Sequence, residues 1–318
     1  MTAATTDAIE LEAPDIGPYR AGNTGIEYAW SFEAAEPGPH VLVNALMHGN
    51  ELCGAVALDF LFRRGFRPRR GRLSLSFANV AAYRTFDPQR PAASRFRDED
   101  MNRVWSPEAL GGPRGSAELD RARELRPLFD AADLVLDLHS MQNATAPLTL
   151  CGQTARARGF ARRLGFPGWV VADAGHAAGR RLIDYGRFAD PQGAAIAILV
   201  ECGQHWERAA AEVAIETTLR FLVLSGSLDA ADAAPWLPDA PPPAPRVVQV
   251  VEAVTVATDR FAFAEPYRGM EIIPRAGTVI AHDDDRPVLT PHDDCLLIMP
   301  SRRLAKGHTA VRLGRILP

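Results

Sequence analysis

Hydrophobic residues along most of the chain fall into two alternating patterns: short apolar runs, and longer segments with helical spacing. Residues 41–46 form a short apolar run, and residues 72–80 alternate apolar and polar positions as a half-buried strand does. The segment 51–63 between them is apolar-rich and leads into arginines and a glycine, which is typical of a helix end. The pattern therefore predicts a strand, a helix and a second strand in succession.

This alternation continues to about residue 225 and then stops. Further strands are predicted at 133–139, 148–151, 169–173 and 195–201, with one or two edge strands around 26–32, and further helices at 115–130, 153–164 and 205–225. Strands that alternate with helices are typical of an α/β domain whose sheet is parallel or mixed.

A proline-rich stretch marks a change in composition. The sequence PWLPDAPPPAPR at 235–246 cannot form a helix interior or an inner strand, so it is expected to be a stiff linker. The apolar runs beyond it are short and are separated by Pro, Gly and Asp. We therefore predict an α/β domain over residues 1–237, a linker over 238–246 and a small all-β domain over 247–318.

An irregular stretch from residue 81 to 113 lies inside the α/β part. Connections of this length within a compact domain are usually functional or disordered. Its sequence SRFRDEDMNRVW at 94–105 mixes charged and aromatic residues, which favours an ordered loop.

Composition and charge exclude several classes of protein. The 318 residues are 47% hydrophobic and 23% charged, as in ordinary soluble proteins, and the net charge of −4 argues against a general nucleic-acid binder. The four cysteines are scattered without paired spacing, which argues against a disulfide framework or a cysteine zinc site.

The sequence also argues against a membrane protein. The N-terminus has neither a basic start nor an apolar core, and no apolar run approaches the roughly 20 residues that span a bilayer. We expect a cytoplasmic protein, and the sequence leaves open whether it forms a homo-oligomer.

Three residues suited to binding a metal follow predicted strands. His48 and Glu51 are three residues apart at the start of the predicted helix 51–63, so their side chains are expected on the same side. His139 ends the strand 133–139. Two histidines and a glutamate leave a fourth zinc position open, as in catalytic sites. The alternative is a plain helix start with an exposed histidine and glutamate.

Carboxylates suited to proton transfer lie nearby in the predicted fold. Glu201 ends a strand of apolar residues, where a carboxylate is costly unless it is paired or functional, so it is the natural general base. Asp137 should share a side of its strand with His139, either as a support for the site or as an ordinary buried aspartate. Cys202 is a competing nucleophile, but no histidine in the sequence is placed to activate it.

Arg95, Asn102 and Arg103 are grouped in the loop before the predicted helix 115–130. A guanidinium grips carboxylates bidentately, so this loop could bind a carboxylate. The alternative is a structural salt bridge to Asp98 or Asp100.

These motifs, in this order, resemble the succinylglutamate desuccinylase/aspartoacylase family of the wider zinc-carboxypeptidase group. The resemblance covers roughly residues 40 to 300 and rests on HGNE at 48–51, DEDMNR at 98–103, DLH at 137–139, VECG at 200–203 and FAFAEPYRGMEIIPRAGTVIA at 261–281. It implies a zinc-carboxypeptidase-like mixed α/β sheet flanked by helices, with a small C-terminal all-β domain.

The resemblance also implies roles for the matched residues. His48, Glu51 and His139 match the zinc ligands of the family, which bind one Zn²⁺ per chain, and Glu201 matches its general base. Arg95 matches an arginine near the scissile carbonyl. Asn102 and Arg103 match the pair that binds the substrate carboxylate.

One position departs from the family pattern. Pro191 stands where the aspartoacylases place a further substrate-binding arginine. Either Arg187, Arg181 or Arg180 substitutes from the same connection, with Arg187 the first choice, or this function is absent. Tyr267 is only a poor local match for the family's C-terminal active-site tyrosine.

The resulting hypothesis is a zinc-dependent hydrolase acting on the linear amide bond of a small N-acyl amino acid. An alternative is a zinc carboxypeptidase acting on short peptides, which needs the same ligands and base. A second alternative is a non-catalytic relative that binds a small molecule.

Overall fold

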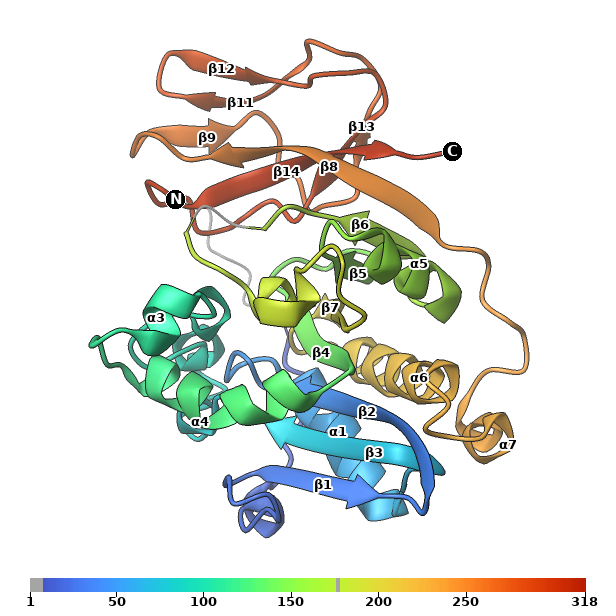
Figure 1. Cartoon of the computed structure of the whole chain (residues 1–318). Helices are drawn as coiled ribbons and strands as arrows, with labels where there is room; N and C mark the ends of the chain where they lie inside the picture. Colours follow the sequence, from blue (N-terminus) through green and yellow to red (C-terminus); the bar gives the residue numbers. More distant parts are fainter. Residues whose placement is uncertain (1–7, 176–177) are drawn as a thin grey trace.

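The computed structural model describes residues 8–175 and 178–318, and within them a mixed sheet of eleven strands forms the centre of the molecule (Figure 1). The strand order is β1-β3-β2-β4-β7-β5-β6-β8-β14-β13-β10, and a second sheet has the order β12-β11-β9. The strands are β1 (Ala29–Glu33), β2 (Glu36–Ala45), β3 (Arg70–Phe77), β4 (Leu134–Met141), β5 (Leu148–Cys151), β6 (Trp169–Ala172), β7 (Ile196–Gln204), β8 (Arg246–Thr255), β9 (Phe261–Phe263), β10 (Ile272–Ile273), β11 (Val279–Asp283), β12 (Arg286–Leu289), β13 (Cys295–Ile298) and β14 (Thr309–Ile316).

Helices cover both faces of the sheet. The α-helices are α1 (Leu52–Arg64), α2 (Val80–Tyr83), α3 (Pro107–Gly111), α4 (Ala117–Ala131), α5 (Ala155–Leu164), α6 (Arg208–Leu224) and α7 (Ala230–Ala233). Helices α1, α5 and α6 pack on one face, together with Val43 of β2 and Leu136 of β4. Helices α3 and α4 pack on the other, with Leu42 and Val135. Strands β2 and β4 are therefore buried on both sides, which explains their nearly continuous apolar sequences.

The predicted fold class is confirmed. β2 pairs in parallel with β3 and β4, and β4 pairs in parallel with β7, whereas β5 runs antiparallel to β7. The ends of two strands differ from the prediction: β4 continues to Met141 and β7 to Gln204, so His139 and Glu201 lie within strands near their carboxyl ends.

The irregular stretch 81–113 contains short helices that the sequence pattern did not predict. Helix α3 and two 3-10 helices, Pro91–Ser94 and Met101–Arg103, lie within it. The buried carboxylate of Glu118 in α4 holds the loop, accepting hydrogen bonds from the backbone N–H groups of Arg97 (2.6 Å), Asp98 (3.0 Å) and Glu99 (3.2 Å). The expectation of an ordered loop agrees with these contacts.

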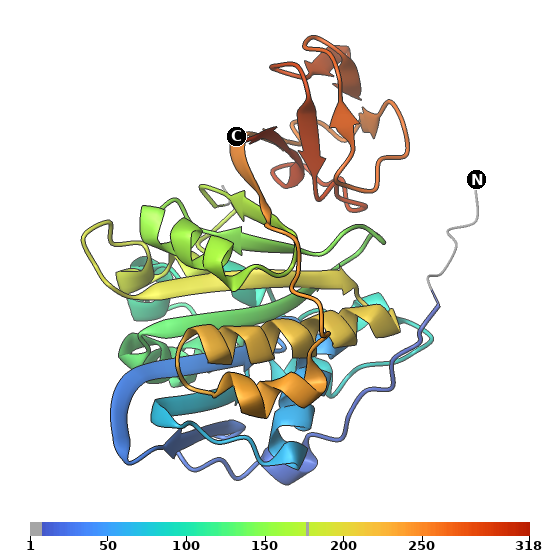
Figure 2. The same ribbon diagram turned by 90° about the vertical axis from the view of Figure 1, so that its right-hand side faces the viewer.

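The C-terminal part is β-rich and connects to the main sheet through one strand. Residues 238–245 have no helix or strand, and β8 then pairs in parallel with β6 (Figure 2). Beyond β8, residues of β11, β13 and β14 form a core of their own. The large sheet thus continues into the C-terminal part, and the division into domains at 1–237 and 247–318 stays a prediction.

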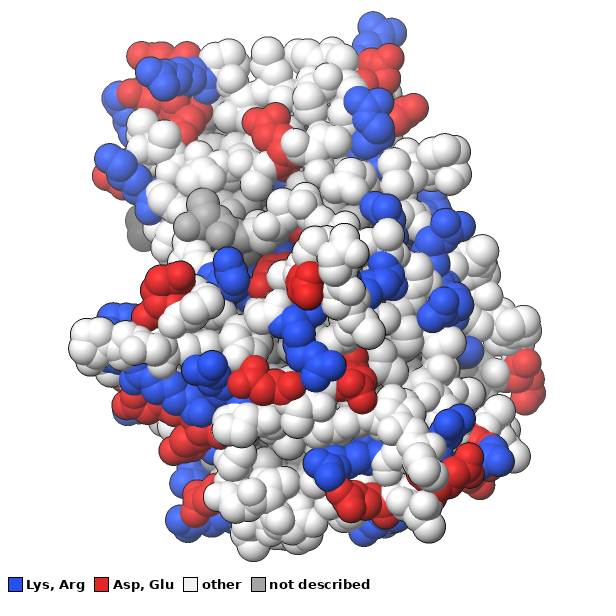
Figure 3. All heavy atoms as spheres, in the orientation of Figure 1, with Lys and Arg blue, Asp and Glu red and all other residues white. Residues whose placement is uncertain are grey.

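The surface carries charges of both signs. Figure 3 shows basic and acidic side chains interspersed on one face, without an extended area of a single sign. In the described part of the chain, no helix has the length and apolar character needed to cross a bilayer.

Candidate metal centre

A tight turn after β2 places His48 and Glu51. Gly49 lies so close to the neighbouring loop that a Cβ atom there would be 2.4 Å from both the Ser94 carbonyl oxygen and the Tyr83 nitrogen, so only glycine fits. The Gly49 N–H also donates to the Arg95 carbonyl oxygen (3.0 Å). This turn therefore joins the start of α1 to the loop that carries Arg95.

Strand register places the other two residues of the site. His139 on β4 is directly opposite Glu201 on β7. Asp137 is two residues before His139 and points to the same face of the sheet, because side chains alternate along a strand. The site therefore lies where α1 begins, near the carboxyl ends of β2, β4 and β7.

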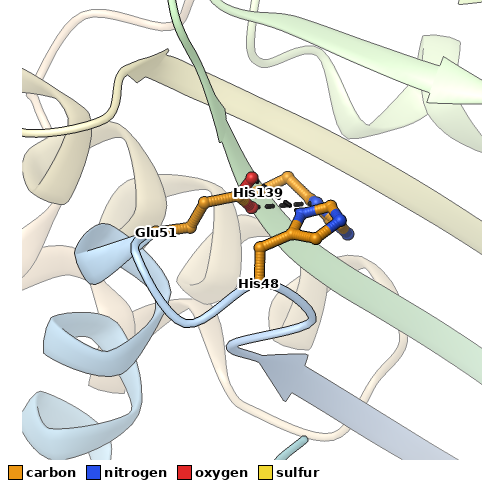
Figure 4. Close-up of side chains that lie close together, drawn as sticks. All are labelled: His48, Glu51 and His139. Atoms are coloured by element: carbon orange, nitrogen blue, oxygen red, sulfur yellow. Dashed lines mark hydrogen bonds and ion pairs between the residues drawn. The ribbon is translucent and has the colours of Figure 1, made fainter. Parts of the chain in front are cut away.

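The side chains of His48, Glu51 and His139, hereafter the His–Glu–His cluster, converge on one point (Figure 4). Glu51 Oε1 lies 2.8 Å from His48 Nδ1, and Glu51 Oε2 lies 2.9 Å from His139 Nδ1. One ligand atom from each residue lies within 4.8 Å of the other two, and all three residues are buried.

Aspartates hold the outer nitrogen of each histidine. Asp100 Oδ1 accepts from His48 Nε2 (2.8 Å), and Asp137 Oδ2 accepts from His139 Nε2 (2.8 Å). Asn44 donates in turn to Asp137 Oδ1 (2.7 Å). A histidine that ligates a metal usually donates its other N–H to a carboxylate in this way.

The charges in the cluster are strongly coupled. Burial acts to raise the pKa of Glu51, but His48 and His139 hold that pKa well below its usual range. Burial acts to lower the pKa of His139, but Asp137 and Glu51 raise it well above its usual value. A buried carboxylate between two imidazoles, each backed by an aspartate, is a donor set that fits a zinc ion.

Glu201 lies beside the cluster, directly opposite His139 in the sheet. Its Oε2 atom is buried and has no hydrogen-bond partner among the residues that the structure describes. Burial, with a smaller contribution from Glu51, raises the pKa of Glu201 to about 8 despite the opposing effect of His139. This carboxyl group can therefore gain or lose a proton near neutral pH.

Arg95 and Arg103 flank Asp100 at the cluster. Arg95 Nη1 donates to Glu51 Oε1 (3.2 Å) and Arg95 Nη2 to Asp100 Oδ2 (3.3 Å), while Arg103 Nη2 is 4.0 Å from the same Asp100 oxygen. Asn102 Oδ1 accepts from the Leu182 N–H (2.9 Å), so this oxygen already anchors the loop. The structure thus brings all three loop residues to the site.

Arg187 is not brought to the site. Its guanidinium donates to the Asp130 carbonyl oxygen (3.0 Å) and to Asp133 (3.3 Å). Asp133 immediately precedes β4, and His139 is six residues further along the chain, a span of roughly 20 Å at about 3.3 Å per residue. Arg187 is therefore at the opposite end of the strand from the cluster.

Another arginine of the same connection lies closer to the site. Arg181 is buried and binds Asp173 (2.9 Å) and Asp184 (2.6 Å). Arg312 of β14 binds the same Asp173 oxygen (2.8 Å). Burial and the charges of Arg95, Arg312 and Arg181 lower the pKa of Arg103 to about 10, so positive charge gathers around Arg103.

Sequence reasoning missed three contributors to the site. Asp100 was considered only as a salt-bridge partner, although it also holds His48. The DEDMNR motif offered a sequence signal for Asp100. No such signal existed for Glu118, which lies in an ordinary helical pattern, or for Arg312, which is remote in sequence.

Two cavities adjoin this region. The larger, hereafter the Arg95 cavity, has a volume of about 640 Å³, and its lining includes Ile9, Pro91, Trp206, Arg95, Arg302 and Arg303. The second, of about 510 Å³, contains Tyr267 together with Asn143 and Glu265. None of the three residues of the His–Glu–His cluster lines either cavity, but Arg95, which binds Glu51 (3.2 Å), lines the first.

Comparison with known proteins points to one family. The model of the succinylglutamate desuccinylase/aspartoacylase catalytic domain matches residues 37–224, more than half of the chain. No curated protein sequence matches the chain.

Solved structures share the fold at low sequence identity. A succinylglutamate desuccinylase from Vibrio cholerae has a TM-score of 0.70 and 18% identity, covering 92% of this chain and 86% of its own. A succinylglutamate desuccinylase/aspartoacylase from Rhodobacter sphaeroides has a TM-score of 0.67 and 20% identity, covering 92% and 90%. The ectoine utilization protein EutE from Ruegeria pomeroyi, in a product-bound structure, has a TM-score of 0.63 and 18% identity, covering 90% and 87%.

Proposed function

Because this chain belongs to the succinylglutamate desuccinylase/aspartoacylase family, we propose that it is a zinc-dependent amidohydrolase that removes the acyl group from a small N-acyl amino acid. The observation that carries the proposal is the convergence of His48, Glu51 and His139 beside Glu201, whose buried Oε2 atom has no hydrogen-bond partner in the described part of the chain. One Zn²⁺ per chain would be held by His48, Glu51 and His139.

Glu201 transfers the proton, and a bound zinc ion would supply Lewis-acid activation. A zinc ion in such a site acts as a Lewis acid that activates water and polarises a carbonyl group. Glu201 takes a proton from the attacking water at its carboxylate and passes it to the leaving amine. The raised pKa of Glu201, about 8, supports this role because the carboxyl group then holds a proton between the two transfers. A bound cation lowers that pKa and favours the ionised base.

Two arginines bind the polar groups of the substrate. Arg95 lies next to Glu51 and donates to the oxygen on which negative charge develops. Arg103 and the amide of Asn102 bind the α-carboxylate, and the nearby positive charges of Arg95, Arg312 and Arg181, opposed by Asp100, support this assignment. Arg187 is left out of this set because it binds at the start of β4.

The assignment is tested with zinc-loaded protein and a substrate panel. The panel contains N-acetyl and N-succinyl amino acids, their α-carboxamides, and short peptides. We expect the acids to be hydrolysed and the carboxamides to be poor substrates. Arg103→Ala should remove that difference, because a charge-assisted hydrogen bond is worth about 1.5–3 kcal/mol, roughly 10-fold to 100-fold.

A control variant and two outcomes complete the test. Arg187→Ala should leave all rates unchanged; a selective loss of dicarboxylic substrates in that variant would restore Arg187 to the site. Equal rates on acid and carboxamide in the wild type would remove Arg103 as the carboxylate-binding residue. Hydrolysis of peptides alone would favour a carboxypeptidase.

A further inference from the structure

The Arg95 cavity lies beside the candidate metal centre and is not used by the mechanism above. Arg95 and His205 are among its lining residues. Other parts of its lining come from distant parts of the chain, among them Ile9, residues 88–92 and Arg303. A cavity built from distant segments is a feature of the tertiary fold rather than of one loop.

Hydrogen bonds hold the walls in place. The Glu10 N–H donates to the Trp206 carbonyl oxygen (2.9 Å), and Glu10 Oε2 accepts from the Arg208 N–H (2.9 Å), so the N-terminal wall is fixed at the start of α6. Arg303 Nη2 donates to the Ala92 carbonyl oxygen (3.4 Å), which joins the C-terminal wall to the loop.

The lining combines apolar and cationic side chains. Pro88, Pro91, Ala92, Ile9 and Trp206 provide apolar surface. The charged side chains among the described lining residues are arginines: Arg95, Arg302 and Arg303. The lining histidine, His205, is neutral because burial lowers its pKa to about 3.

Arg303 is suited to binding an anion. Its side chain has no carboxylate partner among the residues that the structure describes. Burial and the nearby charge of Arg95 lower the pKa of Arg303 against the opposing effect of Asp100, so the guanidinium groups of Arg95 and Arg303 repel each other. A negative group between them would relieve that repulsion.

The positions of Arg95 and Arg103 near the metal centre indicate which part of the substrate enters the Arg95 cavity. Arg95 and Arg103 both lie near Asp100 Oδ2 (3.3 Å and 4.0 Å), and of these two arginines only Arg95 lines the cavity. With the α-carboxylate at Arg103, the amino-acid part lies on that side, and the acyl part extends past Arg95 into the cavity. This step rests on the proposed function.

We propose that the Arg95 cavity binds the acyl part of the substrate, and that this part is an extended chain with an apolar middle and an anionic end held by Arg303. The volume of about 640 Å³ supports a long chain, because an acetyl group would leave most of it empty. Cavities in the range of roughly 300–1,000 Å³ ordinarily hold drug-sized ligands.

The test compares acyl groups on one amino acid, namely the one hydrolysed fastest in the substrate panel. Acetyl, hexanoyl and adipoyl derivatives differ in length and in the terminal carboxylate. We expect kcat/KM to rise in the order acetyl, hexanoyl, adipoyl. Arg303→Gln should lower the adipoyl rate by about 10-fold to 100-fold and leave the acetyl rate within about twofold.

Two further variants separate the cavity from general effects. Ala92 is exposed and lines the cavity, so Ala92→Phe places a large side chain there. This variant should lower the rate of hydrolysis of the hexanoyl and adipoyl derivatives and leave that of the acetyl derivative unchanged. Arg260→Gln removes a surface arginine that binds Asp284 and should change nothing. An acetyl derivative that is the best substrate, or an Arg303→Gln variant that slows all three derivatives equally, overturns the proposal.

Failure of the proposed function gives a different result. If zinc-loaded protein hydrolyses no N-acyl amino acid, calorimetry with N-adipoylglycine and N-acetylglycine measures the cavity alone. Tighter binding of the adipoyl compound, lost in Arg303→Gln, supports the cavity as a site for an anionic chain. Equal binding of both compounds overturns it.

Discussion

Replacement of Glu118 tests how the loop that carries Arg95, Asp100 and Arg103 is held. The Glu118 carboxylate accepts four hydrogen bonds: Oε1 from the Arg97 N–H (2.6 Å) and Asn79 Nδ2 (3.0 Å), and Oε2 from the N–H groups of Asp98 (3.0 Å) and Glu99 (3.2 Å). Glu118→Gln keeps the size of the side chain but turns an NH₂ group towards two of these donors. Those two hydrogen bonds should break.

The expected magnitude follows from the two donors that would have no acceptor. A donor left unsatisfied in a buried place costs about 1–3 kcal/mol. Two such donors would add up to about 2–6 kcal/mol. Because Asp98 is exposed and water can reach its N–H group, we expect a decrease of about 2–4 kcal/mol in the free energy of unfolding. Because small displacements of positioned groups slow catalysis strongly, kcat/KM should fall on the order of 10-fold to 100-fold.

Two measurements and one control decide this prediction. Urea unfolding gives the stability change, and kcat/KM on the best substrate gives the effect on the site. Glu124→Gln is the control, because Glu124 is an exposed residue of the same helix that only pairs with Arg121, and such pairs contribute about 0–1 kcal/mol. If Glu118→Gln behaves like Glu124→Gln in both measurements, Glu118 does not hold the loop.

Three further predictions concern the site. Glu201→Gln should keep its zinc but lose on the order of 10²-fold to 10⁴-fold in kcat, since the amide cannot accept a proton; wild-type kcat in that variant would exclude Glu201 as the base. Asp137→Asn should weaken zinc binding by about 10-fold to 100-fold in a chelator competition, because His139 loses its carboxylate partner; unchanged affinity would contradict that role. Burial lowers the pKa of His205 to about 3, with smaller contributions from Arg95 and His48. Below about pH 6.5, His205 therefore binds a proton in the unfolded chain but stays neutral in the folded chain. The free energy of unfolding falls from that pH towards pH 3, by about 2 kcal/mol at pH 5. Urea unfolding at pH 7.5 and pH 5 should show a smaller fall for His205→Gln than for wild type, and equal falls would refute this.

Much of the fold was predictable because local patterns and tertiary packing agree. Strands β4 and β7 are buried on both faces, so their sequences are mostly hydrophobic. The predicted ends of these strands fall two residues short in β4 and three residues short in β7. The two strands continue to pair with each other beyond His139 and Glu201, as far as Met141 and Gln204, and the sequence pattern does not reveal this pairing.

The site was predictable where its residues follow strands and not where it depends on distant contacts. His48, Glu51 and His139 belong to short motifs, and the structure brings them together. Arg187 was chosen from its position in the sequence alone, yet the connection after β6 turns its guanidinium towards Asp133 at the other end of β4. Glu118 acts through a loop about 20 residues away, which no periodic pattern reveals.

Anomalous diffraction from zinc-soaked crystals, recorded at the zinc absorption edge, tests the central claim most directly. We predict one peak per chain, about 2.0–2.2 Å from His48 Nδ1, from His139 Nδ1 and from a carboxylate oxygen of Glu51. The peak should be absent in His139→Ala crystals prepared in the same way. A wild-type crystal with no peak between these three side chains, or with its zinc bound elsewhere, would contradict the account.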